Sequence, residues 1–143
     1  MIAIIKSQFN QKITDGLLYG CKAALFESNY NEKYIQEIEV PGAFEIPGVA
    51  QKLNKKKLDA IICIGAIIKG ETDHYHFICD SVSNGIMNMS MNSNIPIMFG
   101  ILTCQNFEHA LIRSSNKLLK NKGYEVGKST IKMIEVFNEN NLS

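Results

Sequence analysis

The sequence predicts an α/β domain in which a four-stranded parallel sheet lies between two layers of helices. Strand-like and helix-like segments alternate along the chain, which is typical of parallel sheets with crossover helices. Residues 59–64 are nearly all apolar, as expected of a central strand that helices cover on both faces. The length of 143 residues, 45% of them apolar, suffices for one domain with a substantial core.

The first two predicted strands lie on either side of a helix. Ile2–Lys6 is a short apolar run, and residues 11–28 then place apolar side chains at helical spacing, with Thr14 as a candidate cap. Residues 34–40 alternate apolar and polar side chains until a Pro-Gly pair ends the strand. The chain is therefore expected to begin with a strand–helix–strand unit.

Two further helices flank the apolar strand 59–64. Residues 43–56 are expected to form one of them, and Pro47 is compatible with it only near the first turn. The other is expected to extend from a capping Thr-Asp pair at 72–73 to about Met91.

The C-terminal part of the chain continues the same alternation. Residues 97–102 are the fourth predicted strand, and a helix over 106–122 is capped by its first residue, an asparagine, and closed by Gly123. A last helix covers 124–137, and the polar tail 138–143 is expected to fray. This order predicts right-handed crossovers and a three-layer αβα sandwich, a flavodoxin-like single domain over the whole chain.

Composition excludes several classes of function. The net charge is only +1 and the basic residues are scattered, so no nucleic-acid-binding face is expected. The longest apolar stretch, 60–68, is far shorter than the ~20 residues that span a bilayer, so no membrane segment is expected. The N-terminus does not resemble a signal peptide, since polar residues follow a short apolar run.

The four cysteines form no Cys-x-x-Cys pair and fall inside predicted helices and strands. They are Cys21, Cys63, Cys79 and Cys104. We interpret them as small buried side chains in a reducing compartment, which favours a cytoplasmic protein over one with a disulfide or zinc framework.

The carboxyl ends of parallel strands are where ligands bind in sheets of this kind. Four loops leave that edge, at residues 7–10, 41–45, 65–73 and 103–105. The third is the most informative, because the chain is expected to turn through Gly65 and Gly70 and then to present free backbone N–H groups at a helix start. His74 lies in the first turn of that helix, where an imidazole can move protons beside a bound anion.

Two of the other loops carry aromatic side chains. Phe9 lies between Gln8 and Asn10, and either plugs the core or provides a stacking surface for a flat heterocycle. Phe44 has the same two interpretations. Glu45 either favours the helix start electrostatically or accepts hydrogen bonds from a polyol or a ring N–H.

A basic stripe is predicted on the helix over 106–122. His109, Arg113 and Lys117 are spaced one turn apart, which is usually the pattern of a solvated face. Opposite a helix N-terminus, the same stripe would complete a phosphate site with Arg113 as the bidentate donor. Phe99 lies between apolar neighbours of the last strand, and its default place is the core.

Metal and covalent chemistry find little support in the sequence. His74 and His76 would share a face only on a strand, and His76 with Asp80 has no third ligand fixed by spacing, so no metal is expected. No Gly-x-Ser-x-Gly, Gly-x-Gly-x-x-Gly or Walker A pattern occurs, which disfavours acyl-enzyme chemistry and nucleotide hydrolysis.

Taken together, these motifs resemble the lumazine synthase family, from residue 2 to about residue 136. The resemblance rests on several long motifs in order: Phe9-Asn10, VPGAFEIP at 40–47, GAIIKGETDHYHF at 65–77, IPIMFGILT at 95–103, Arg113 with Lys117, and NKG at 121–123. It implies a flavodoxin-like fold. It also implies a transferase of riboflavin biosynthesis that condenses 5-amino-6-ribitylaminouracil with 3,4-dihydroxy-2-butanone 4-phosphate, releasing phosphate and water without cofactor or metal.

The resemblance also implies a role for each matching residue. His74 would transfer protons, Phe9 would stack on the pyrimidine, and Arg113 would clamp the phosphate. Glu71 and Thr72 would cradle the phosphate, Glu71 through its backbone N–H because a carboxylate repels an anion. The remaining substrate contacts would come from Ala43, Phe44, Glu45, Ala66, Ile67 and Ile68, with Phe99 supplied by a neighbouring subunit.

Members of the family are expected to act as homo-oligomers, pentamers or 60-subunit shells, with sites between subunits and riboflavin synthase as a candidate partner. This chain departs from the common pattern at Gln8 and Lys69, where arginine is usual, and at Glu71, where a small residue is usual. The family's N-terminal segment before the first strand is also essentially absent. The absence of this segment leaves the size of the assembly open.

Three other functions remain compatible with the sequence. An archaeal-type riboflavin synthase has a similar architecture but does not depend on phosphate. A flavodoxin-like binding module would bind flavin or a phosphorylated ligand without turnover. A shell protein without activity would assemble but form no product, although the retained Phe9, His74 and Arg113 disfavour it.

Overall fold

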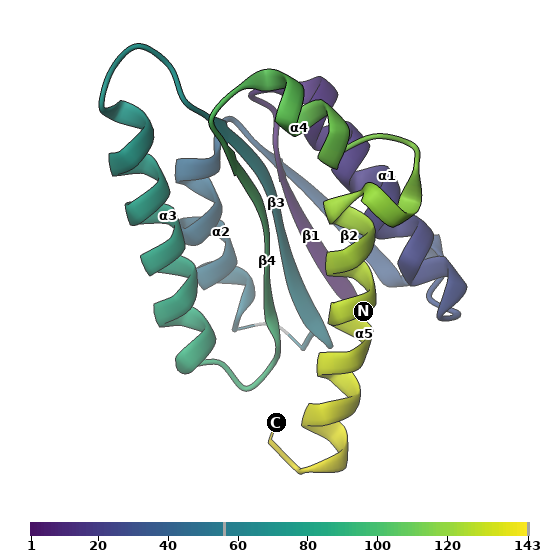
Figure 1. The fold of residues 1–143 in the computed structure, drawn as a ribbon. Helices are drawn as coiled ribbons and strands as arrows, with labels where there is room; N and C mark the ends of the chain where they lie inside the picture. Colours follow the sequence, from purple (N-terminus) through teal and green to yellow (C-terminus); the bar gives the residue numbers. More distant parts are fainter. Residues whose placement is uncertain (56, 143) are drawn as a thin grey trace.

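A four-stranded parallel sheet forms the centre of the protein. The computed structural model describes residues 1–55 and 57–142. The strands are β1 (Ile2–Ser7), β2 (Ile35–Val40), β3 (Ala60–Ile68) and β4 (Ile97–Cys104). Their order in the sheet is β2-β1-β3-β4, so β1 and β3 are central and β2 and β4 are the edges (Figure 1).

Helices cover both faces of the sheet, as predicted. On one face lie α2 (Ile46–Leu53) and α3 (His74–Met91). On the other lie α1 (Gln11–Glu27), α4 (Phe107–Arg113) and α5 (Lys122–Glu139), as Figure 1 shows. The predicted α/β class, with a four-stranded parallel sheet in a three-layer flavodoxin-like sandwich, is therefore confirmed.

The core consists of two apolar layers separated by the sheet. Alternate residues of each central strand contribute to each layer, as the two-residue period of a strand requires. Ile5 and Cys63 pack with the α2 and α3 side, whereas Ile4 and Ile62 pack with the α1, α4 and α5 side. Both central strands are thus buried on both faces, which explains their nearly uninterrupted apolar sequences.

The third strand is longer than predicted, because it continues past Gly65 to Ile68. Its last residues pair with β4, Ile67 beside Thr103 and Ile68 beside Cys104. Gly65 is therefore inside the strand rather than in a turn. A Cβ at Gly65 would lie 3.1 Å from Ser7 Oγ and 3.2 Å from Ile46 Cδ1, so packing rather than turning favours glycine there.

Several element boundaries in the first half differ from the prediction by a few residues. Thr14 is inside α1 and does not cap it; the N-cap residue is Asn10, in the left-handed region at φ 59°. A 3₁₀ turn, η1 (Glu32–Tyr34), precedes β2, so Tyr34 is not part of the strand. The predicted helix over 43–56 begins as a 3₁₀ turn, η2 (Ala43–Glu45), and α2 ends at Leu53; its predicted last residue, Lys56, lies outside the described residues.

The predicted helix over 106–122 is two separate helices. Asn106 caps α4 as expected, since its Oδ1 accepts from the His109 N–H at 2.9 Å, but α4 ends at Arg113. A 3₁₀ turn, η3 (Leu118–Lys120), leads to α5, so Lys117 does not share a helix face with Arg113.

Asn121 fixes the start of the second of these helices. Its side-chain Nδ2 donates to the carbonyl oxygens of Gly16 (2.9 Å) and Ser115 (2.8 Å), and its Oδ1 accepts from the Tyr124 N–H at 3.1 Å. These bonds start a new helix at Lys122 and fix it against α1. Gly123 consequently lies in the first turn of α5 and closes no helix.

The C-terminus is more helical than predicted. Because α5 extends to Glu139, the first two residues of the predicted tail are part of it. Asn140–Leu142 lie beyond the helix and are exposed, and Ser143 lies outside the described residues.

Within residues 1–55 and 57–142, no helix combines the length and the apolar character that a membrane crossing requires.

The close approach of α1 and α5 can be tested at Gly123. A Cβ at this position would lie 1.9 Å from the Leu17 carbonyl oxygen, so Gly123→Ala is expected to lower the free energy of unfolding by about 2–3 kcal/mol. The control is Gly48→Ala in α2, where a Cβ meets no atom within 4 Å. Because alanine favours the helix over glycine, this variant is expected to raise the free energy of unfolding by about 0.5–1 kcal/mol. Denaturant unfolding measures both variants, and equal stabilities would contradict this packing.

Candidate active site

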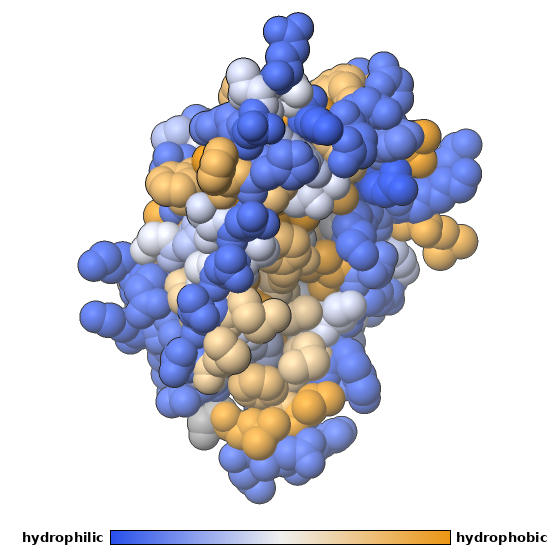
Figure 2. Space-filling model, turned by 60° about the vertical axis from the view of Figure 1, so that its left-hand side comes forward, coloured by the Kyte–Doolittle hydropathy of each residue, from blue (hydrophilic) through white to orange (hydrophobic). Residues whose placement is uncertain are grey.

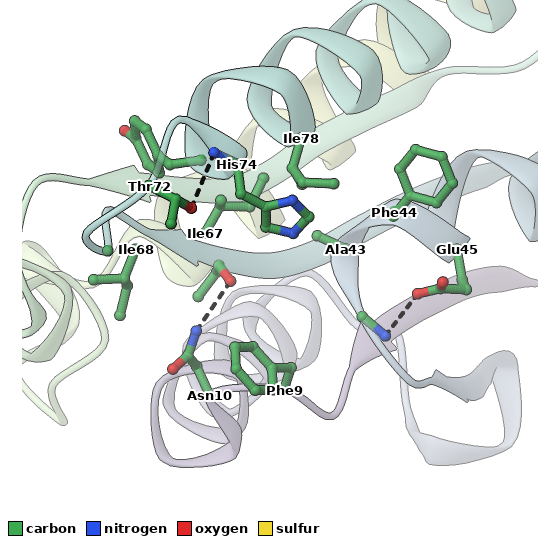
Figure 3. Close-up of a pocket in the computed structure, with 14 residues that line it drawn as sticks. Phe9, Asn10, Ala43, Phe44, Glu45, Ile67, Ile68, Thr72, His74 and Ile78 are labelled. Atoms are coloured by element: carbon green, nitrogen blue, oxygen red, sulfur yellow. Dashed lines mark hydrogen bonds between the residues drawn. The ribbon is translucent and has the colours of Figure 1, made fainter.

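A cavity of about 610 Å³ lies where the loops after β1, β2 and β3 meet (Figure 3). Its lining residues are Phe9, Asn10, Gly42, Ala43, Phe44, Glu45, Ala66, Ile67, Ile68, Gly70, Thr72, His74, Tyr75 and Ile78. The cavity therefore occupies the carboxyl edge of the sheet, on the side of α2 and α3, at the position expected for a ligand in this architecture.

The loop after β1 presents Phe9 at the cavity rather than to the core. The Phe9 side chain is 73% exposed, which excludes the core-plug interpretation. Two backbone bonds continue the pairing of β1 with β2 beyond the strands: Gln8 N–H donates to the Val40 carbonyl at 2.8 Å, and Phe9 N–H donates to the Pro41 carbonyl at 3.0 Å. An exposed aromatic ring on a backbone fixed in this way is suited to stack on a planar ligand.

Asn10 connects this loop to the central strand. Its Nδ2 donates to the Ala66 carbonyl oxygen at 3.3 Å, and asparagine is one of the residues that tolerate the left-handed backbone found here. Asn10 thereby holds the start of α1 and Phe9 close to the end of β3 (Figure 3).

The loop after β2 contributes a second aromatic side chain and a carboxylate. Ala43 is buried, whereas Phe44 is 59% exposed at the cavity. Glu45 Oε2 accepts from the Gly42 N–H at 2.9 Å, so the carboxylate stabilises the helix start while it lines the cavity. The position of Glu45 therefore agrees with both interpretations from the sequence, a carboxylate that stabilises the helix start and one that accepts hydrogen bonds from a ligand.

His74 and Thr72 form the wall at the start of α3. His74 is the first residue of the helix, and its backbone N–H donates to Thr72 Oγ1 at 3.3 Å. In Figure 3 the imidazole lies over Ile67 and faces the cavity between Ala43 and Ile78. The only His74 hydrogen bond to another side chain found among the described residues is that of its backbone N–H, so the ring nitrogens can bind a ligand.

Tyr75 also lines the cavity, and it is mostly buried. Burial, together with the neighbouring Cys79 thiol, raises the pKa of the Tyr75 phenol above its ordinary value. The hydroxyl is therefore protonated at neutral pH.

Three residues of the predicted site do not line this cavity. The Glu71 side chain is exposed outside it. Phe99 lies on the edge strand β4 and is 40% exposed, so it is not a core residue. Arg113 lines a separate cavity of about 380 Å³ with Lys120 and Lys122, and its Nη1 donates to the His109 carbonyl at 3.1 Å.

The two cavities share no lining residue. The second lies beside the carboxyl end of β4, between that strand and the segment from Arg113 to Glu125. A single copy of the chain therefore does not bring Arg113 to His74.

Sequence reasoning missed five lining residues: Asn10, Gly42, Gly70, Tyr75 and Ile78. Four of them adjoin residues that were singled out. His74 and Ile78 are one helical turn apart, so both side chains lie on one face of the helix. This spacing could have predicted Ile78 as a lining residue.

Among the described residues, no three or more His, Cys, Asp and Glu side chains are grouped closely enough to hold a metal ion. His76 does not line the cavity, and its ring lies against Tyr75 with 5.1 Å between ring centroids.

The cavity combines two exposed aromatic rings, backbone carbonyls at a strand end, a carboxylate and an imidazole beside a helix start. These groups can stack on a planar ring, accept its N–H hydrogen bonds and transfer protons to an adjacent group.

The family model described as 6,7-dimethyl-8-ribityllumazine synthase matches residues 1–138 of the 143. The chain belongs to the 6,7-dimethyl-8-ribityllumazine synthase family of condensing enzymes, which act in riboflavin biosynthesis.

Proposed function

We propose that the cavity at the carboxyl edge of the sheet is the larger part of the condensation site, and that a second copy of the chain completes it. The family's reaction joins 5-amino-6-ribitylaminouracil to 3,4-dihydroxy-2-butanone 4-phosphate and releases phosphate and water. The observation that carries this proposal is the convergence of Phe9, the 43–45 loop, the end of β3 and His74 on one cavity.

The pyrimidine would bind between Phe9 and the end of β3. Phe9 offers an exposed ring face for stacking, and the backbone of Ala66, Ile67 and Ile68 offers hydrogen-bonding groups at the strand end. Ala43, Phe44 and Glu45 would enclose the ribityl chain. The apolar walls would exclude water from the ring and strengthen these polar contacts.

His74 would move the protons that the reaction requires. An amine adds to a ketone, the resulting imine loses phosphate, and the ring then closes; each step needs a proton added or removed but no redox carrier. An imidazole can both donate and accept protons near neutral pH. Alignment of the two substrates can supply about 7–11 kcal/mol, so one proton-transfer group is sufficient.

The phosphate would bind at the start of α3. Thr72 and His74 line the cavity at this helix start, and the helix dipole favours an anion there. Glu71 would contribute its N–H, because its side chain lies outside the cavity lining. One positive side chain is then needed to clamp the phosphate.

Arg113 and Phe99 would come from the second copy. Both lie on the β4 side of the chain, beyond the cavity that holds His74, and both are exposed. An edge strand with an exposed aromatic ring and an arginine nearby is suited to dock beside the cavity of a neighbour. One continuous site would then contain His74 from one copy and Arg113 from the next.

Assembly into an oligomer agrees with the exposed apolar surface. Figure 2 shows apolar residues gathered over the middle and lower part of the face on the α3 side. Phe77, Met87 and Met91 of α3 and Phe99 of β4 are large exposed apolar side chains, and such surface marks interaction sites. We propose a homopentamer, with a 60-subunit shell as the larger alternative and riboflavin synthase as a partner.

The role of His74 predicts a moderate loss of rate. His74→Ala is expected to lower kcat by about 10–10³-fold while substrate alignment survives. His76→Ala is the matched control, since His76 does not line the cavity, and it should retain wild-type kcat. Steady-state kinetics measure both, and equal kcat values for the two variants would contradict the proton-transfer role.

A site shared between copies predicts complementation. Arg113→Ala alone should raise the KM of the phosphorylated substrate about 10–100-fold, the loss of a charge-assisted hydrogen bond. Co-expressed His74→Ala and Arg113→Ala chains should then recover about a quarter of the wild-type activity, because random assembly of a cyclic oligomer leaves that share of sites with both residues. Co-expression without any gain over the separate variants would mean that both residues act within one copy.

The assembly itself can be measured by sedimentation velocity. We expect the purified chain to sediment as an oligomer of at least five copies at micromolar concentration, since each site needs a neighbour. A monomer with full activity under these conditions would exclude the shared site.

A further inference from the structure

Lys6 is the only charged residue of the two central strands, and it is buried, with 4% of its surface exposed. Its ammonium group pairs with the carboxylate of Asp15 in α1 and with Glu39 Oε1 in β2, the latter at 2.8 Å. A lysine at such a position requires charged partners, because a buried charge without them is strongly destabilising.

Glu39 extends this ion pair toward the cavity. While its Oε1 accepts from Lys6, its Oε2 accepts from Gln8 Nε2 at 3.0 Å. Gln8 immediately precedes Phe9, and its backbone N–H donates to the Val40 carbonyl, the next residue after Glu39. A single carboxylate thus connects the buried ammonium group to the loop that carries the stacking ring.

The charges of this network support one another. Burial by itself lowers the pKa of Lys6, but the hydrogen bonds to Asp15 and Glu39 outweigh it and leave the pKa raised. The hydrogen bonds from Lys6 and Gln8 lower the pKa of Glu39 below its ordinary value. Lys6 and Glu39 are therefore ionised at neutral pH, and the hydrogen bonds between them and Gln8 are of the stronger, charge-assisted kind.

None of Lys6, Gln8 and Glu39 lines the cavity, so none of them would touch a substrate bound there. They act instead on the loop after β1, whose aromatic ring is mostly exposed and whose backbone is hydrogen-bonded to the loop after β2. A loop fixed before the ligand arrives loses less conformational entropy on binding.

We propose that Lys6, acting through Glu39 and Gln8, is a positioning residue that fixes Phe9 for binding of the pyrimidine substrate. The inference rests on the proposed function, in which Phe9 stacks on that substrate. It predicts an effect confined to one of the two substrates. Among the described residues, the start of α3, where the phosphate would bind, shares no hydrogen bond or ion pair with this network.

The test compares two carboxylates of the same strand. Glu39→Gln keeps the size of the side chain but removes the charge that joins Lys6 to the loop, and Gln8→Ala removes the last link. Glu37→Gln is the matched control, since Glu37 pairs with Lys22, away from the cavity. Two quantities are measured for each variant: the KM of each substrate, and the hydrogen-exchange rate of the Phe9 amide, which donates to the Pro41 carbonyl.

We expect Glu39→Gln and Gln8→Ala to raise the KM of the pyrimidine by about 5–30-fold and to leave that of the phosphorylated substrate within about twofold, because only preorganisation of the ring-binding loop is lost. The Phe9 amide should exchange faster in both variants than in Glu37→Gln. Lys6→Met, where it folds, should show the same pattern, and its effect should not add to that of Glu39→Gln, since both act on one network.

The inference is overturned if Glu39→Gln and Gln8→Ala match Glu37→Gln in the pyrimidine KM, or if both substrates weaken equally. Unchanged exchange of the Phe9 amide would overturn it as well. The exchange experiment needs no substrate, so it decides about the network even if the wild-type chain forms no product, which would count against the proposed function. A wild-type chain that turns over while the variants match the control would refute the role of Lys6 alone.

Discussion

Burial of β1 and β3 on both faces is the constraint on which the rest of the structure depends. Each central strand is hydrogen-bonded to a strand on either side and covered by helices above and below. Polar groups inside such strands would lose water without compensation. The polar side chains that could bind a ligand are therefore confined to the loops at the ends of the strands. Parallel pairing brings three of those loops to one edge of the sheet.

The same constraint explains why the residues of the proposed site lie at two separate cavities of the chain. The cavity forms where the loops after β2, β1 and β3 meet. The groups near β4 lie beside an edge of the sheet that no further strand covers within the described residues. Phe99 and Arg113 are exposed at that side. A neighbouring copy is the simplest way to bring a cation to the cavity that holds His74. Lys6 is the exception inside the central strands, and its two carboxylate partners compensate for its burial.

The strands, the layers and most of the cavity could be predicted because they depend on local patterns and on one topological rule. Apolar runs and alternation mark strands directly, and ligands bind beyond their carboxyl ends. Phe9, Phe44 and His74 could therefore be assigned to one site before any coordinates. The family match agrees with the fold and the reaction that these motifs implied.

The predictions were wrong where contacts between residues far apart in the sequence determine the structure. The end of β3 depends on its pairing with β4, which no local pattern around Gly65 reveals. The segment over 106–122 is not one helix: α4 ends at Arg113, and the next α-helix starts after Asn121, which bonds to the carbonyl of Gly16, far away in the sequence. Lys117 therefore does not share a helix face with Arg113. The Lys6 network likewise joins residues from three elements and has no signature in the sequence.

The most direct measurement is to mix the purified chain with both substrates and follow the lumazine chromophore together with released phosphate. A condensing site at the carboxyl edge predicts that product and phosphate appear in equal amounts, without any added metal or cofactor. Absence of product, or consumption of the lumazine itself to give riboflavin without phosphate release, would contradict it.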